Sequence, residues 1–163
     1  MIMLPSTVTD AAIASELPGA MEWAKRRDLV IDIRLLSEKI IRLVLVQENT
    51  DEKFYLQGKF DGYKALPPVW DWRDDTWSKR NELILSPKPE NNPITSMFIK
   101  HKNKSIICAP FNRLAYSHDG PHSGWGNPAQ WMTVGLEYIH AATIGDMLQS
   151  IMRDFRFTKG RMV

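Results

Sequence analysis

One cysteine is the residue of this chain with the clearest capacity for covalent chemistry. Cys108 ends an apolar run, Ser105-Ile106-Ile107-Cys108, and is followed by Ala109 and Pro110. A thiolate placed where a strand gives way to a loop is a strong nucleophile that can accept an acyl group, although its ordinary pKa is about 8.5. Free cysteines are, however, most often small buried hydrophobic residues. The residues around Cys108 leave both interpretations open.

The segment that follows carries further reactive side chains, His118, Asp119 and His122. A cysteine hydrolase would use a histidine as base and Asp119 to orient it. A zinc site could use Cys108, His118 and His122 as ligands. No CxxC or HExxH motif accompanies them. A third interpretation is a loop whose polar side chains bond to its own backbone, and it needs the fewest groups placed together.

Aromatic residues gather before this region, at Trp70, Trp72 and Trp77. They could form a stacking platform, but no basic stripe surrounds them, so packing over the edge of a sheet is favoured. Arg113 and Tyr116 either line a site or anchor the loop that carries them.

Composition excludes several classes of protein. The chain has 163 residues, 44% of them hydrophobic, and 21 basic against 19 acidic residues give a net charge of +2. This predicts one globular domain without the charge of a nucleic-acid or membrane-surface binder. One cysteine cannot form an internal disulfide, which suits a reducing cytosol. We find no run long enough to span a membrane and no signal peptide, so we expect a cytoplasmic protein.

Hydrophobic periodicity predicts a helix followed by strands. Residues 8–27 are expected to be helical in one or two pieces, with Pro18 in the first turn of the second. Three strands with short polar breaks then predict an antiparallel meander. Their inward-facing residues are expected to be Ile31, Ile33 and Leu35; Ile41, Leu43 and Leu45; and Phe54, Leu56 and Phe60.

The second half alternates between irregular and regular segments. Residues 61–70, with Pro67 and Pro68, should leave the sheet or form its edge, and residues 71–95 should cover the surface. We expect one more strand within 98–108 and a second irregular stretch over 109–130. A capping box at Thr143 and Asp146 opens a helix, whose apolar stripe is Ile144, Met147, Leu148, Ile151, Met152 and Phe155.

These elements predict one α+β domain over residues 1–163, with 1–7 and 158–163 as flexible ends. Its parts are an N-terminal helix, a four-stranded antiparallel meander, long flap loops and a C-terminal helix packed on the sheet.

This order resembles the fold of ubiquitin-conjugating enzymes (E2), and in particular divergent bacterial E2-like proteins. The segment 60–69 looks like the family's proline segment after the third strand. Lys104-Ser105-Ile106-Ile107-Cys108 looks like its catalytic cysteine motif, and Trp131 with the helix from Ala142 looks like the tryptophan and helix behind the site. His101-Lys102-Asn103 is the nearest equivalent of the family's His-Pro-Asn motif, although it lies closer to the cysteine.

The resemblance implies that Cys108 carries a ubiquitin-like modifier as a thioester, received from an E1-like enzyme and passed to an amine of an acceptor protein. Asn103 or Asn112 would stabilise the oxyanion, and His118, Asp119 or His122 would deprotonate the amine. The N-terminal helix, with Lys25, Arg26 and Arg27, would meet the E1-like partner.

The expected partners are therefore the modifier, the activating enzyme and the acceptor, without nucleic acid, membrane, metal or cofactor. Bacterial members of this family work in conjugation systems that include antiviral defence. Two alternatives remain open: an inactive E2-like module that binds a partner through the sheet and the Trp70–Trp77 loop, and the Cys/His metal or hydrolase site.

Overall fold

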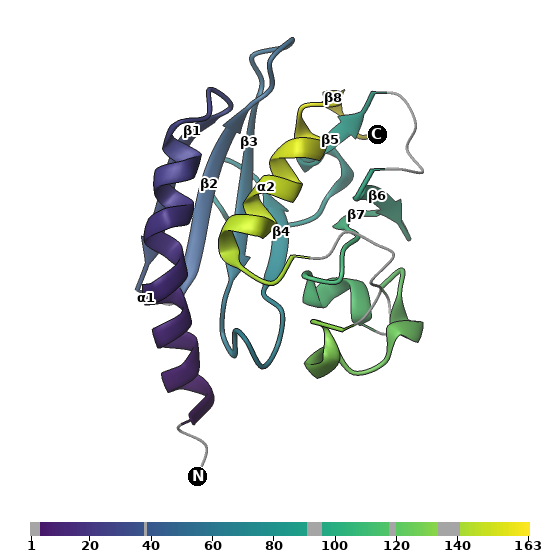
Figure 1. The fold of residues 1–163 in the computed structure, drawn as a ribbon. Coiled ribbons are helices and arrows are strands. Elements are labelled where there is room, and N and C mark those ends of the chain that lie inside the picture. The colour runs from purple at the N-terminus through teal and green to yellow at the C-terminus, as the bar shows by residue number, and fades with distance from the viewer. Residues whose placement is uncertain (1–3, 38, 91–95, 118–119, 134–140) are drawn as a thin grey trace.

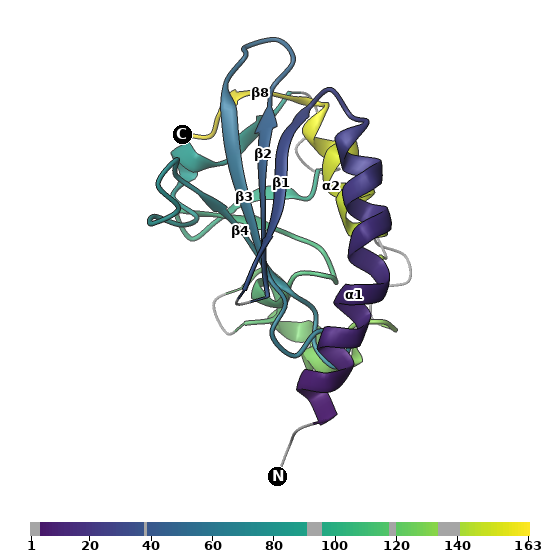
Figure 2. The same cartoon turned by 90° about the vertical axis from the view of Figure 1, so that its left-hand side faces the viewer.

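A four-stranded antiparallel sheet covered by two helices forms the body of the protein in the computed structural model. The structure describes residues 4–37, 39–90, 96–117, 120–133 and 141–163, with side chains from residue 8 onward except that of Ser123. Figures 1 and 2 show α1 (Leu4–Lys25) and α2 (Ile144–Phe155) on the same side of the sheet. The predicted α+β class and its layout are confirmed.

The sheet has the order β1-β2-β3-β4, with β1 at Val30–Leu36, β2 at Ile40–Val46, β3 at Lys53–Lys59 and β4 at Val69–Arg73. All neighbours are antiparallel, as in a meander. The fourth strand is thus Val69–Arg73, at the edge of the sheet, so residues 69–70 form an edge as one alternative predicted. The prediction that residues 71–95 cover the surface is wrong for Asp71 and Trp72, which are buried in β4. Residues 98–108 hold two strands instead of one, outside this sheet. Pro67 and Pro68 lie just before β4, so every residue of β4 keeps its backbone N–H and can pair with β3.

Most of the predicted inward-facing residues are buried, including Ile41, Leu43, Leu45, Phe54 and Leu56. The first strand differs, because a bulge between Val30 and Asp32 shifts its register. Val30 and Ile33 therefore face the core, and Ile31 is 50% exposed. Leu35 lies on the same face as Ile33, opposite Ile41, but it is 45% exposed near the end of this edge strand. A bulge changes which face each side chain occupies, and simple alternation cannot anticipate it.

Helix α1 is one uninterrupted helix that contains Pro18. The two-piece alternative predicted from that proline is not realised, since burial of Ile13, Leu17, Ala20 and Ala24 holds both halves on the core. Helix α2 begins as predicted: the Thr143 Oγ1 accepts a hydrogen bond from the Asp146 N–H at 3.1 Å. Its whole predicted apolar stripe is buried.

Two small ribbons lie beside the sheet (Figure 1). Strand β5 (Pro87–Pro89) pairs with β8 (Thr158–Arg161), and β6 (Phe98–His101) pairs with β7 (Lys104–Ile107). Residues 158–161, expected within a flexible end, instead form β8, where the buried Thr158 bonds to Gln47 at 3.0 Å. Short 3₁₀ turns at Leu83–Leu85, Arg113–Tyr116, Ser123–Trp125 and Pro128–Gln130 complete the fold.

Candidate functional site

Cys108 directly follows β7 and extends its pairing by one residue. Its backbone N–H donates to the Met97 carbonyl at 2.6 Å. Ser105 and Ile107 are buried, whereas Ile106 and Cys108 are half-buried, so the alternation of the strand places the thiol on the outward face of the hairpin. Burial raises the pKa of the Cys108 thiol to about 11. The thiol is therefore protonated at neutral pH, and it is partly accessible.

The two asparagines expected near the thiol have different positions. Asn103 is exposed in the two-residue turn between β6 and β7, with a φ of 65°. From Lys104 at the start of β7 to Cys108, four residues of extended chain span about 13 Å. The structure thus places Asn103 at the far end of the hairpin from the thiol.

Asn112 is buried and bonds to backbone on three segments. Its Oδ1 accepts from the N–H groups of Trp70 and Leu114 at 3.0 and 3.3 Å. Its Nδ2 donates to the carbonyls of Trp70 and Ile107 at 3.2 and 2.8 Å. The amide is thus fully used in tying β4 to β7 and to the 3₁₀ turn, and has no donor left for an oxyanion.

His122 is the one predicted base that the structure describes, since His118 and Asp119 lie outside the described residues. Its ring stacks on Trp125, with centroids 3.9 Å apart and planes at 4°. Desolvation, followed by repulsion from His101, lowers the pKa of His122. The imidazole is thereby held in its neutral form, which can accept a proton.

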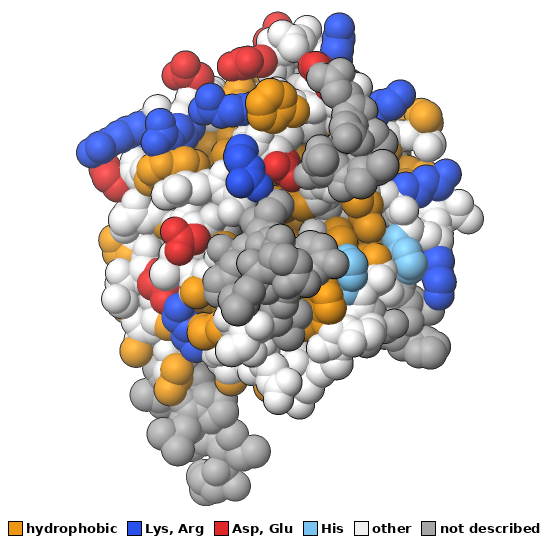
Figure 3. Space-filling view, turned by 45° about the vertical axis from the view of Figure 1, so that its right-hand side comes forward, with side chains coloured by type: hydrophobic (Ala, Val, Ile, Leu, Met, Phe, Trp, Pro, Cys, Tyr) orange, Lys and Arg blue, Asp and Glu red, His pale blue; other side chains and the backbone are white. Residues whose placement is uncertain are grey.

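His101, at the end of β6, appeared in the sequence analysis only as part of the His101-Lys102-Asn103 motif, without a role of its own. Its Nε2 is buried and has no hydrogen-bond partner among the described residues. It lines a cavity of about 470 Å³ on the outward face of the hairpin, together with Arg80, Asn81, Lys102, Lys104, Ile106, Leu114 and Ser117. Figure 3 shows histidine side chains near hydrophobic ones on this face of the molecule. The turn residues Lys102-Asn103 could have predicted the hairpin that aligns His101 with Lys104.

Arg113 and Tyr116 anchor the irregular segment. The Arg113 guanidinium donates to the carbonyls of Pro67 and Asp61 at 3.0 and 2.6 Å. The Tyr116 hydroxyl donates to the Pro110 carbonyl at 2.7 Å. Of the two roles left open for these residues, the structure supports the anchoring one.

The tryptophans before the site belong mainly to the core. Trp70 and Trp72 are completely buried, and Trp72 makes ring contacts with Phe54, Phe98 and Phe155. Gly58 is needed beside them, because a Cβ there would approach the Trp70 ring to 2.7 Å. The packing interpretation is confirmed, so Trp70 and Trp72 cannot form a surface for a partner.

No three His, Cys, Asp or Glu side chains meet as metal ligands among the residues that the structure describes. Of the three ligands proposed for a metal site, His118 lies outside those residues. No helix in the described part of the chain is long and apolar enough to cross a membrane.

Comparisons of the chain with models of protein families, with curated proteins and with solved structures found no match.

Proposed function

We propose that this chain is an E2-like carrier protein that holds a ubiquitin-like modifier as a thioester on Cys108. The observation that carries the proposal is the position of the thiol, half-buried but accessible on the outward face of β7 where the strand ends. The α+β layout, with its N-terminal helix, antiparallel sheet and C-terminal helix, agrees with the order of elements in that family.

Loading is an exchange of one thioester for another. The Cys108 sulfur attacks the carbonyl carbon of the modifier's C-terminal glycine, which arrives as a thioester on the activating enzyme. A new C–S bond forms, the old C–S bond breaks, and the departing thiolate takes up the proton that Cys108 loses. Because the Cys108 pKa is raised to about 11, the resting thiol is protected from stray electrophiles and needs a proton acceptor when it is loaded.

Transfer then moves the acyl group to an amine of the acceptor. The amine nitrogen forms a C–N bond, the bond to the Cys108 sulfur breaks, and the proton that the amine gives up returns in the end to the departing sulfur. We assign that proton to His122, whose lowered pKa favours the neutral imidazole and whose ring stacks on Trp125. The role requires that the segment carrying His122 bring its ring to the thioester. Asn112 takes no part in this step, since its amide is already fully bonded.

A small thioester tests the proposal without the natural partners. The folded protein is incubated with a Gly-Gly peptide thioester of 2-mercaptoethanesulfonate and then with free lysine. Intact mass spectrometry should show one adduct on the wild type, and dithiothreitol should remove it. Cys108→Ser should form no adduct that dithiothreitol removes. His122→Gln should load normally and transfer the acyl group to lysine about tenfold more slowly.

A native protein that forms no adduct, while its urea-unfolded form is acylated at Cys108, contradicts the carrier function. Equal discharge to lysine by the wild type and His122→Gln contradicts the role of His122 alone. The control in the same irregular segment is Gln130→Ala, at an exposed position, which should discharge at the wild-type rate.

The second candidate is an E2-like module that binds partners without catalysis. The raised pKa of Cys108 and the structural use of Asn112 favour it. In that case Cys108 in the native protein resists iodoacetamide under conditions that label it completely after unfolding. Such a module cannot use Trp70 or Trp72 for contact, because both are buried.

A further inference from the structure

The cavity beside His101 is lined by side chains that donate hydrogen bonds. Its volume of about 470 Å³ is typical of a site for a small molecule. Arg80, Lys102 and Lys104 contribute cationic groups to its walls, and no acidic side chain lines it among the described residues. A cavity of this composition suits a ligand that carries negative charge and accepts hydrogen bonds.

Asn81 supplies a donor that is held in place from behind. Its Oδ1 accepts a hydrogen bond from the Trp72 N–H at 3.1 Å, and its backbone carbonyl accepts from the Ser105 N–H at 2.9 Å. The residue is only 9% exposed, yet its Nδ2 donates to no group in the described part of the chain. This nitrogen is not one of the enclosed polar atoms, so it is reached from the cavity that Asn81 lines.

Two further donors come from the hairpin, and one comes from the residue before Asn81. His101 and Lys104 pair across the turn between β6 and β7, so their Cβ atoms lie about 5 Å apart on one face. The His101 Nε2 is buried without a partner, and Lys104 forms no ion pair with a described residue. Arg80 shares one nitrogen with Asp71 at 3.4 Å, which leaves its other guanidinium nitrogens for a further acceptor. A bound acceptor would satisfy these groups together.

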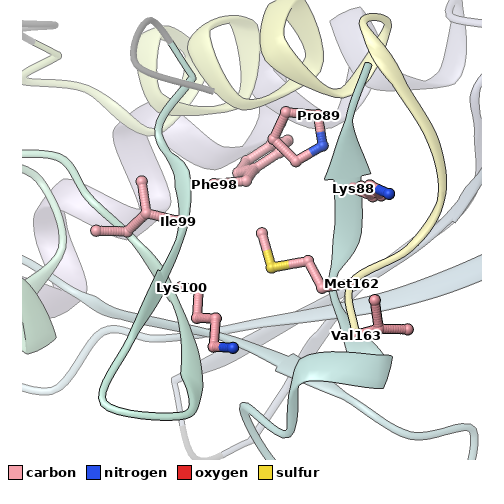
Figure 4. Close-up of a pocket in the computed structure, with 7 residues that line it drawn as sticks. All are labelled: Lys88, Pro89, Phe98, Ile99, Lys100, Met162 and Val163. Atoms are coloured by element: carbon pink, nitrogen blue, oxygen red, sulfur yellow. The ribbon is translucent and has the colours of Figure 1, made fainter. Parts of the chain in front are cut away.

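The cavity between β5 and β6 provides a contrast. Figure 4 shows the side chains of Pro89, Phe98 and Met162 directed into that space, and apolar side chains form most of its wall. Apolar contacts of this kind do not orient a ligand. In the cavity beside His101, donors from three separate segments can fix both the position and the charge of a bound group.

We propose that the cavity beside His101 binds a small phosphate monoester. Its four donating side chains match the three terminal oxygens and about two negative charges of a phosphate monoester better than the two oxygens and single charge of a carboxylate. Ile106 and Leu114 also line the cavity and would contact the carbon body of the ester. Cys108 does not line it, so this binding function does not depend on the thioester function.

A simple probe is n-butyl phosphate, which joins a phosphate monoester to a short apolar chain. Isothermal titration calorimetry with the full chain should show saturable binding, about tenfold tighter than the binding of pentanoate, which carries a carboxylate on the same butyl group. In ¹⁵N-labelled protein, the side-chain NH₂ signals of Asn81 should shift along the same saturation curve. That shift distinguishes binding in the cavity from general attraction to lysines on the surface.

Asn81→Asp changes the open donor with little change of shape. The aspartate keeps an acceptor for the Trp72 N–H and tolerates the φ of 57° that Asn81 adopts. It replaces the donating nitrogen by a negatively charged oxygen, so we expect about tenfold weaker binding of n-butyl phosphate. Thermal unfolding checks that the variant remains folded.

A second pair of variants tests the charge at exposed positions. Lys104→Gln removes one cation from the cavity and should weaken binding about threefold. Lys100→Gln is the matched control, because it removes the same charge from the opposite face of the same hairpin and should bind like the wild type. Since both lysines are exposed, this comparison remains valid where Asn81→Asp lowers stability.

The proposal is overturned by any of three results: no saturable binding of n-butyl phosphate, equal affinity for pentanoate, or saturation without a shift of the Asn81 signals. Equal binding by Lys104→Gln and Lys100→Gln would also contradict it. Cys108→Ser should bind the probe like the wild type, so a failure here is distinguishable from a failure of the thioester function.

Discussion

The two helices with their sheet and the segment around Cys108 are held together in different ways. In the first region, backbone groups pair in ladders and helices, and rings such as Phe54, Trp72 and Phe155 fill the space between them. In the second, irregular backbone is connected by buried amides: Asn81 bonds to the Trp72 N–H and Asn112 bonds to both backbone groups of Trp70. The cysteine is thus positioned by a few polar side chains rather than by regular structure, because irregular buried backbone must find its partners among side chains.

The largest expected effect tests the apolar region. Phe155→Ala removes a ring that is 1% exposed and contacts both Phe54 and Trp72. We expect a loss of about 3–5 kcal/mol in the free energy of unfolding, measured by urea denaturation. Phe157→Ala is the matched control, because that ring is 63% exposed and should change stability little. A small loss for Phe155→Ala would mean that α2 is not part of the core.

The polar counterpart is Asn112→Ala. It leaves buried backbone groups of Trp70 and Ile107 without partners, and we expect a loss of roughly 2–4 kcal/mol. Alkylation of Cys108 should also become faster, because the segment that follows it is released. Asn127→Ala removes an amide that caps an exposed 3₁₀ turn at Ala129, and it should cost much less. Equal losses for the two variants would remove the distinction between the regions.

A tight backbone contact in the same segment gives a smaller effect. A Cβ on Gly120 would collide with the backbone carbonyls of Leu114 and Ala115, whereas a Cβ on Gly124 would meet nothing within 4 Å. Gly120→Ala should therefore destabilise the protein by about 1–3 kcal/mol, and Gly124→Ala should be nearly neutral, in thermal unfolding. Tolerance of Gly120→Ala would indicate that the segment can move away from this contact.

The smallest effect concerns the pH dependence of stability. The Cys108 thiol ionises near pH 8.5 when unfolded and near 11 when folded, so the unfolded state loses its proton first. The contribution of Cys108 is complete below pH 8.5 and is lost as the pH rises toward 11. Between pH 8 and 10, the urea midpoint of the wild type should therefore fall relative to that of Cys108→Ser. A difference that stays constant would mean an unshifted thiol.

The sequence predicts the helices and their sheet better than it predicts the segment around Cys108. Regular periodicity identified the apolar stripe and the capping box of α2, and the inward-facing residues of β2 and β3. It did not identify β4, which is five residues long, follows two prolines and contains the buried Asp71 between two tryptophans. Short strands of this kind are defined by their pairing partners, which local pattern does not report.

In the candidate site, the sequence singled out Cys108 and His122 by type alone. It could not show that Asn112 is fully bonded, that Asn103 lies at the far end of the hairpin, or that repulsion from His101 helps to lower the pKa of His122. Each of these depends on contacts between segments that lie far apart in the chain or on the register of one hairpin.

The sequence by itself determined the α+β class, the C-terminal helix and the place of the lone cysteine after an apolar strand, because periodicity and residue chemistry are local properties. Only the tertiary structure decided the burial of the thiol and the roles of the asparagines. Those properties arise from desolvation and from hydrogen bonds between distant segments, and neither exists until the chain has folded.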